Sequence, residues 1–284
     1  MSTPTIMTVR SPSLLTEGRK AWAYLTKEFL MEASYRFAFL FSLFGICTGI
    51  ATFFFIDRLF GHRIAPALVP FGTSYFAYVL VGNAFFAYVG TALGGVSGRL
   101  AHEQSLGTLE AILLTPTRLW VFVMAMAVWN TFYATFQVLL YFVVGGVGFG
   151  VNFSQINWVS LLSILALVII SFNSLGLLEA GCILVFKRGT FVAWAFNGLW
   201  SLLGGVFFPT TVLPEWLQRV SACIPITYAI RGLQQAIYQG APVTQLTREL
   251  GILGAFCVVL VPSGLWSWRW ALRRAKLDGS LSQH

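Results

Sequence analysis

Charged side chains are scarce in this sequence. Only 10% of its 284 residues are Asp, Glu, Lys or Arg, whereas a soluble domain carries about 25%. Hydrophobic residues make up 57% of the chain. A chain of this composition cannot keep most of its surface in water. We therefore expect an all-α membrane protein, because helices satisfy their own backbone hydrogen bonds in lipid.

Motifs for chemistry are also missing. The four cysteines and three histidines show no CxxC or Cys/His spacing that would hold a metal ion. No GxxxxGK[ST] motif occurs, so the chain has no phosphate-binding loop of its own. The net charge of +8 is not arranged as a basic stripe interleaved with aromatics, and we expect no nucleic-acid partner.

Long uncharged runs predict the membrane spans. The run 37–56 is long enough at about 1.5 Å per residue to cross roughly 30 Å of hydrocarbon. Asp57 to Arg63 would then form the first external loop. Six spans are predicted, near 37–56, 71–97, 120–145, 158–186, 191–208 and 250–268. Most Lys and Arg residues then share the side of both termini, which the positive-inside rule makes cytoplasmic. The basic residues left outside are Arg58, Arg63, Arg219, Arg231 and Arg248.

The stretch 11–34 has helical spacing of apolar residues. Trp22, Leu25 and Phe29 share one face, and Lys20 and Lys27 lie on the other. Such a helix before a span is expected to lie in the interface and to contact membrane lipids. The alternative is an ordinary amphipathic helix packed on protein.

A polar interlude, 99–118, separates two apolar runs. Leu109, Ile112 and Leu113 fall on one face of a short helix that can begin near Gly107-Thr108. Pro116 would end it, because proline cannot continue the hydrogen-bond ladder. A rigid amphipathic helix of this kind can insert into a groove on a soluble partner. The alternative is a solvated loop whose charges only set topology.

The region 209–245 is unusually apolar for an extracellular loop. Pro209, Pro214 and Pro225 divide it into pieces too short to span, the second carrying Trp216 and Leu217. We interpret the pieces as outer helices that dip partly into the membrane and gate the exit. A plain extracellular loop is the alternative.

Two motifs carry a resemblance to a known family. The string GTLEAILLTP from Gly107 to Pro116, with Glu103 ahead of it, resembles the cytoplasmic loop of ABC-2 type transporter permeases. The downstream string GGVFFPTTVLPEWL, followed by Pro225, Tyr228 and Arg231, resembles the same family, in its drug-efflux and nodulation-factor branch.

The resemblance implies a single ABC-2 type transmembrane domain, 1–284, in the bacterial inner membrane. It would pair with a second permease copy or homologue and with separate ATPase subunits that bind ATP and Mg²⁺, while this chain holds no cofactor. The resemblance also implies that the ATPase docks on the interlude, at Glu103, Gly107, Thr108, Leu109, Glu110, Ile112, Leu113 and Pro116.

The expected cargo is an amphiphile: a hydrophobic drug, a lipid or a glycolipid. A lipid-linked polysaccharide remains an alternative. Exporters of such glycans usually carry an Arg-Asp-Leu-Lys type motif before the first span, where this chain has Lys27-Glu28-Phe29-Leu30.

Two further residues are candidates for function. Glu179 is a charge placed inside a predicted span, and it either faces the translocation path or pairs locally near Lys187. Ser97 lies in a GxSG pattern, as in intramembrane serine proteases, but such a nucleophile needs a histidine base. None of His62, His102 and His284 lies inside a predicted span.

Overall fold

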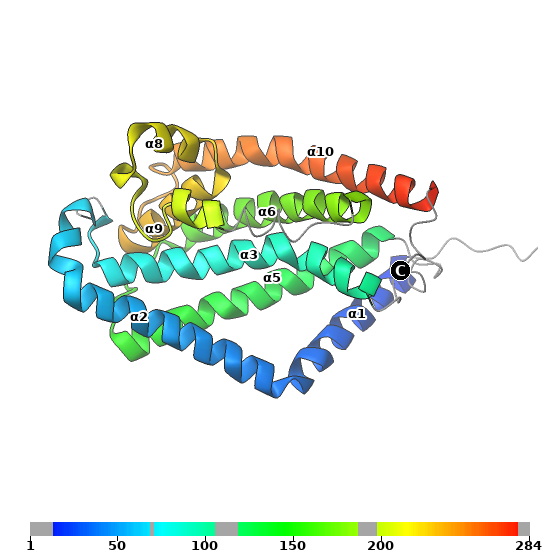
Figure 1. Cartoon of the computed structure of the whole chain (residues 1–284), viewed down its shortest axis with the longest axis horizontal. Coiled ribbons are helices and arrows are strands. Elements are labelled where there is room, and N and C mark those ends of the chain that lie inside the picture. The colour runs from blue at the N-terminus through cyan, green and yellow to red at the C-terminus, as the bar shows by residue number, and fades with distance from the viewer. Residues whose placement is uncertain (1–13, 69–70, 106–118, 187–197, 278–284) are drawn as a thin grey trace, which may run out of the picture.

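The computed structural model describes residues 14–68, 71–105, 119–186 and 198–277, and every regular element in these ranges is a helix (Figure 1). Five of the helices are long and apolar enough to cross a membrane, with candidate spans at Phe39–Phe60, Tyr75–Gly95, Val123–Gly148, Trp158–Cys182 and Thr247–Ala271. The all-helical prediction is thus confirmed. The predicted span 191–208 is described only from residue 198 onward, as a short helix at 198–203 followed by turns at 204–208. The count of six therefore stays a prediction.

The bounds of the long helices are α1 Leu14–Ser34, α2 Arg36–Leu68, α3 Tyr75–Ser105, α5 Leu119–Val143, α6 Trp158–Phe186 and α10 Thr247–Leu277. Among the long helices, α2, α3, α5 and α6 follow one another in alternating directions, and α10 runs in the same direction as α6 (Figure 1). A π-helical turn, η2 Val144–Gly148, ends α5. Between α6 and α10, after the short helix at 198–203, the described residues contain η3 Thr210–Val212, α8 Glu215–Ala222 and α9 Pro225–Tyr238.

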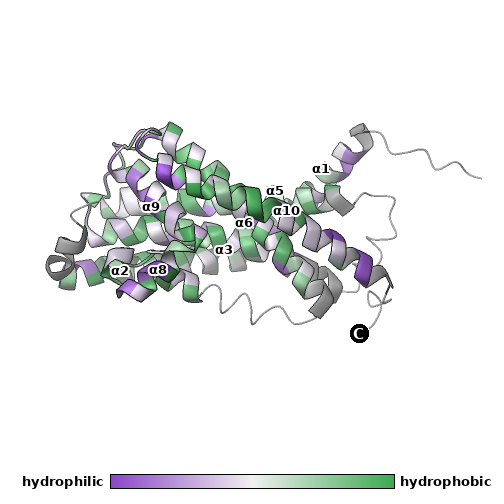
Figure 2. Cartoon of the chain, turned by 90° about the horizontal axis from the view of Figure 1, so that it is seen from above, coloured by the Kyte–Doolittle hydropathy of each residue, from purple (hydrophilic) through white to green (hydrophobic). Residues whose placement is uncertain are grey.

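The molecule has two distinct ends (Figure 1). At one, which we call the terminal end, α1 and α5 begin and α3, α6 and α10 finish. At the other, the cap end, α2 meets α3 and α5 meets α6, beside α8 and α9. Figure 2 shows hydrophobic residues along the middle of the long helices and hydrophilic residues gathered toward the ends. This is the pattern of a helical bundle in a bilayer.

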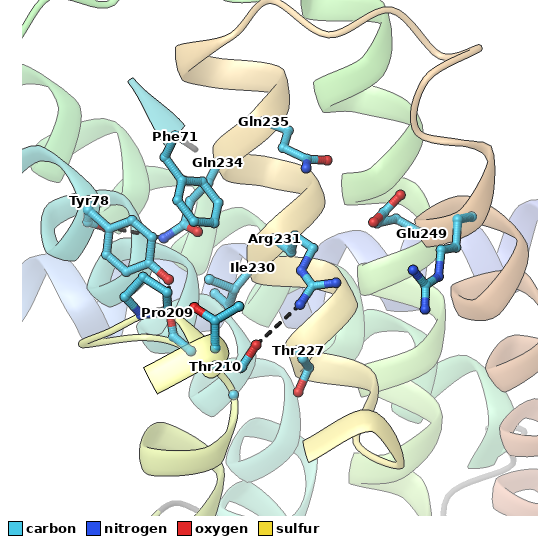
Figure 3. A pocket seen from close by; sticks show the side chains of 14 residues that line it. Phe71, Tyr78, Pro209, Thr210, Thr227, Ile230, Arg231, Gln234, Gln235 and Glu249 are labelled. Atoms are coloured by element: carbon cyan, nitrogen blue, oxygen red, sulfur yellow. Dashed lines mark hydrogen bonds between the residues drawn. The ribbon is translucent and has the colours of Figure 1, made fainter. Parts of the chain in front are cut away.

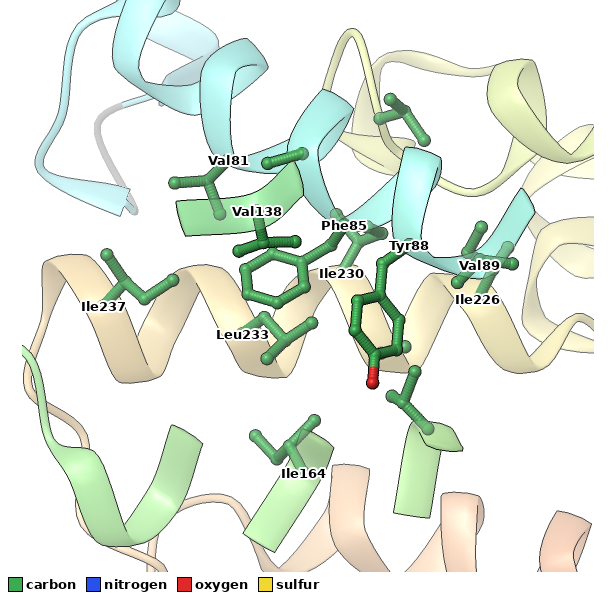
Figure 4. Close-up of a cluster of buried hydrophobic side chains, with 14 of the residues drawn as sticks. Val81, Phe85, Tyr88, Val89, Val138, Ile164, Ile226, Ile230, Leu233 and Ile237 are labelled. Carbon is green, nitrogen blue, oxygen red and sulfur yellow. The ribbon is translucent and has the colours of Figure 1, made fainter. Parts of the chain in front are cut away.

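Helix α3 occupies the centre of the bundle. Within its candidate span 67% of the most apolar stretch is buried, against 6% for α2. Phe85 and Tyr88 of α3 are enclosed by Leu233 of α9, Ile164 of α6 and Val138 of α5 (Figure 4). Helix α2 instead presents large apolar side chains outward, including Phe37, Phe41, Phe44 and Phe55. Its surface is therefore left for lipid or another protein.

Small residues bring helix backbones into direct contact. A Cβ atom on Gly264 of α10 would lie 2.5 Å from the carbonyl oxygen of Ser174 in α6. A Cβ atom on Gly176 of α6 would lie 2.7 Å from the carbonyl oxygen of Ala92 in α3. Close approach of this kind supplies the van der Waals packing that holds helices together in lipid.

The expected external loop at Asp57–Arg63 is wrong, because α2 continues through these residues to Leu68. A helix need not end where the hydrocarbon ends, and charged residues are compatible with helical backbone. The Arg58 guanidinium lies 5.3 Å from the centroid of the Phe54 ring one turn earlier, which stabilises the cation on the helix surface.

Candidate functional site

The predicted docking residues lie at the terminal end, mostly beyond what the structure describes. Gly107, Thr108, Leu109, Glu110, Ile112, Leu113 and Pro116 all fall in 106–118, outside the described residues. Glu103 lies in the last turns of α3, but its side chain is not described. The described part of the predicted interlude is therefore its beginning, at Arg99.

Arg99 is bound by two other helices. Its Nη1 is paired with Glu28 Oε2 of α1, and its Nε donates a hydrogen bond of 3.1 Å to Asn130 Oδ1 of α5. Lys27 Nζ lies 4.0 Å from the other Glu28 oxygen. We call Arg99, Glu28, Asn130 and Tyr24 the Arg99 cluster. It connects α1, α3 and α5 next to the predicted docking loop.

Burial makes this cluster energetically important. Glu28 is only 7% exposed and Asn130 only 2%. A buried carboxylate without its cation costs several kcal/mol, so Arg99 and Glu28 depend on each other. Burial, and then the charge of Glu28, raise the pKa of Tyr24 and keep its phenol neutral. Gly95 leaves room for the Asn130 amide, since a Cβ there would lie 2.2 Å from Asn130 Nδ2.

The face of α1 that packs against the rest of the protein is not the face of Trp22, Leu25 and Phe29. Glu17, Tyr24 and Glu28 are spaced i, i+7 and i+11, which places them on one side of the helix. The two glutamates are buried, and α1 packs against α5. On the opposite side Trp22 and Phe29 are 71% and 57% exposed, while Leu25 is half-buried. Acidic residues at that spacing were the signal for a protein contact.

The cap end is built from the predicted proline-divided pieces. We call residues 204–246 the cap segment. Pro209 precedes η3, Pro214 precedes α8, and Pro225 is the first residue of α9. Helix α8 exposes Trp216 and leaves Leu217 half-buried, whereas Pro209 and Pro225 are buried. The predicted breaks are therefore confirmed, while insertion of these helices into the membrane stays a prediction.

Hydrogen bonds fasten the cap segment to the start of α3. The Tyr78 hydroxyl donates to the carbonyl of Gly205 at 2.8 Å, and Gln234 Nε2 donates to the carbonyl of Tyr78 at 3.3 Å. The Tyr238 hydroxyl donates to the carbonyl of Ala77 at 2.6 Å. Helix α9 is consequently fastened to α3 near its C-terminal end, through Gln234 and Tyr238.

A cavity of about 360 Å³ lies between the cap segment, the start of α3 and the first turn of α10 (Figure 3). We call it the cap pocket. Its walls carry the charges of Arg231, Arg248 and Glu249. Arg231 Nη2 also donates to Thr210 Oγ1 at 3.2 Å, which links α9 to η3. This pocket joins residues far apart in the sequence and was not predicted.

A second, apolar groove of about 500 Å³ lies where α1 turns into α2 and meets α5. Its walls are mainly aromatic, with Phe29, Phe39, Trp129 and Phe132 among them. Glu32 and Arg36 also line it. A groove of this composition suits an amphiphilic molecule or the side chains of another protein. We call it the elbow groove.

Glu179 lies in α6, half-buried, about two turns before the end of the helix at Phe186. It lines neither the cap pocket nor the elbow groove. Its predicted role in a translocation path remains a prediction.

Ser97 and His102 both fall in α3, five residues apart. A helix turns by about 100° per residue, so the two backbone positions face directions about 140° apart. His62 lies near the end of α2, at the cap end, and His284 is outside the described residues. A serine–histidine pair at Ser97 receives no support from this arrangement.

Taken together, these features define an all-helical multispan membrane protein with a packed cap at one end and a polar interhelical cluster at the other. The family model for the ABC-2 type transporter matches residues 19–238. The chain belongs to this family.

Several curated permeases are similar to the chain. The inner membrane transport permease YadH of Escherichia coli K12 is 25% identical over 206 residues, which cover 72% of this chain and 78% of that protein. The putative transport permease YvfS of Bacillus subtilis is 21% identical over 206 residues, covering 71% and 80%. The linearmycin resistance permease protein LnrN of Bacillus subtilis is 24% identical over 141 residues, covering 46% of this chain and 37% of LnrN.

Proposed function

We propose that this chain is the permease subunit of an ATP-driven exporter in the bacterial inner membrane. It pairs with a second permease copy or homologue, and the translocation path for the cargo runs between the two permeases. Separate ATPase subunits bind ATP and Mg²⁺ and dock on the 99–118 loop at the terminal end, which is cytoplasmic. Cargo leaves at the cap end.

The observation that best supports this proposal is the Arg99 cluster. Arg99 stands at the start of the proposed docking loop and is bound to Glu28 of α1 and Asn130 of α5. A displacement of the loop by an ATPase is then passed to three helices at once. Coupling of this kind needs contiguous packed contacts between the docking site and the membrane helices, and the cluster supplies them.

We further propose that the cargo is an amphiphile. The elbow groove supports this choice, because it offers aromatic walls for an apolar tail beside Glu32 and Arg36 for a polar head. It lies where α1 ends and α2 begins, beside the middle of α5. The relative LnrN is named as a linearmycin resistance permease protein.

Changing Leu109 and Leu113 together to Ser tests the proposal. We expect the ATPase subunit to co-purify poorly and export to fall, because the apolar face of the docking helix is lost. A matched control changes exposed Val212 and Val220 at the cap end to Ser, which leaves co-purification intact. Normal assembly and normal export in the Leu109/Leu113 double variant would refute the docking assignment.

A further inference from the structure

The cap pocket contains a buried glutamate, Glu249. Glu249 is 6% exposed and lines the pocket from the first turn of α10. Within the described ranges its carboxylate takes part in no ion pair of 4.0 Å or less and in no side-chain hydrogen bond. A carboxylate that opens into a cavity can accept a hydrogen bond from a donor or a cation of a ligand. Glu249 is therefore suited to receive one from a ligand.

Gln234 lines the same cavity. It is fully buried, and its Nε2 donates to the carbonyl of Tyr78. Its amide oxygen has no hydrogen-bond partner in the described part of the chain. That oxygen has less than 1 Å² of accessible surface, so it is enclosed by protein and is not open to a ligand in the cavity.

Cationic groups lie on the other part of the wall. In Figure 3 the Arg231 side chain reaches from α9 into the space that the Glu249 carboxylate faces from α10. Arg248 also lines the pocket. Guanidinium groups present a planar fork of donors that matches phosphate or carboxylate oxygens. The pocket thus carries positive groups for an anion and a carboxylate for a donor.

We propose that the cap pocket binds a headgroup that combines a phosphate with a primary ammonium group, as phosphoethanolamine does. The phosphate lies on Arg231 and Arg248, and the ammonium group donates to Glu249. This inference rests on the proposed function, for which it names the class of cargo headgroup. The cavity volume is at the lower end of ligand sites, about 300–1,000 Å³, so it holds a headgroup while acyl chains stay outside.

The test uses the full-length protein in nanodiscs without its ATPase. Binding of dihexanoyl phosphatidylethanolamine is compared with binding of the phosphatidylcholine and phosphatidylglycerol analogues, which lack ammonium N–H donors. We expect the ethanolamine lipid to bind about tenfold more tightly, as one additional charge-assisted hydrogen bond provides. Water-soluble phosphoethanolamine, added alone, shows whether the headgroup suffices or a lipid is required.

Variants of pocket residues test whether the lipid preference arises in the cap pocket. Glu249→Gln should bring the three lipids to within about twofold of one another, and Arg231→Gln should weaken all three about tenfold. Glu215→Gln and Arg219→Gln remove matching charges from exposed positions on α8 and should leave binding unchanged. Because Arg231 also bonds Thr210, Glu249→Gln alone decides the case if the arginine variant does not fold.

Equal affinity of the unaltered protein for the three lipids would overturn the inference. So would a Glu249→Gln variant that keeps the preference. Neither result bears on the ATPase docking test, which is read from co-purification and export. Failure of the headgroup assignment and failure of the exporter assignment are thus distinguishable.

Discussion

At the scale of single residues, the side chains that link distant helices are polar and buried. Glu28 and Arg99 are 71 positions apart in the sequence, and Arg99 and Asn130 are 31 apart. Each is costly to bury alone and favourable to bury together. The cluster therefore fixes how α1, α3 and α5 meet, which packing of apolar surface alone specifies poorly in lipid.

Arg99→Met should leave Glu28 as an uncompensated buried charge and destabilise the protein by about 3–5 kcal/mol. Adding Glu28→Gln to this variant should recover part of the loss, because the stranded charge is removed. The measurement is thermal unfolding of the detergent-solubilised protein. Lys27→Met, which removes the more exposed cation beside Glu28, serves as the control and should cost less than about 1 kcal/mol. A double variant no more stable than Arg99→Met would argue against mutual dependence.

The sequence could place Arg99, Asn130 and Glu28 on helices but could not pair them. The interhelical partner of Asn130 could not be predicted, because a hydrogen bond between two helices produces no periodic pattern in the sequence. The cap pocket escaped prediction for the same reason: Tyr78 and Gln234 are 156 positions apart. Sequence patterns such as helical periodicity relate only residues that are a few positions apart along the chain.

At the scale of helices and turns, the cap segment is a series of short helices separated at prolines. Helix α8 is tied to α9 by the Thr227 hydroxyl, which donates to the carbonyl of Ser221 at 2.8 Å, and Ser221 Oγ donates to the carbonyl of Leu203 at 2.6 Å. Rigid pieces with fixed joints can adopt two discrete packings, which alternating exposure of a path requires.

Pro209→Ala tests the role of the joints. An alanine removes the restriction that separates the turn at 204–208 from η3, and we expect export to slow several-fold because the gate favours one packing. Membrane insertion and ATPase co-purification should persist. Pro242→Ala, at an exposed position after α9, is the control. Export at the normal rate in Pro209→Ala would assign the gate to another element.

Contact between α6 and α10 depends on Gly264. Gly264→Ala would place a Cβ 2.5 Å from a backbone oxygen, so the helices must separate, and we expect a loss of about 1–3 kcal/mol in unfolding free energy. Gly254→Ala on the same helix has no atom within 4 Å of the new Cβ and should be neutral or stabilising. If both variants unfold alike in detergent, the close contact does not set stability.

Prolines made the cap segment predictable, since their effect on helix boundaries is local. Pro209, Pro214 and Pro225 each mark an observed element boundary. The end of α2 was mispredicted because charge was taken as the end of a helix. Charge marks only where the hydrocarbon ends, and Asp57 and Arg58 are helical.

At the scale of the whole molecule, the proposed orientation makes the cap end external. The Cys223 side chain is exposed there, whereas Cys47, Cys182 and Cys257 are only half-exposed and lie within candidate spans. We therefore expect a membrane-impermeant maleimide to label Cys223 in intact cells and to leave the Cys223→Ser variant unlabelled. A cysteine introduced at Ser282 should react only after the cells are lysed. Labelling of that residue in intact cells would show that the orientation is opposite to the one proposed.

The central position of α3 has a consequence for how the protein is made. This helix leaves the ribosome early, but much of the surface that encloses it belongs to α6 and α9, which are translated later. Until then its Tyr78 and Tyr88 face lipid or other chains. Helix α2, which is scarcely buried, is complete as soon as it is inserted. Chains that stop after α5 should therefore be removed by membrane proteases, and two halves divided in the turn between α5 and α6 should accumulate only when produced together.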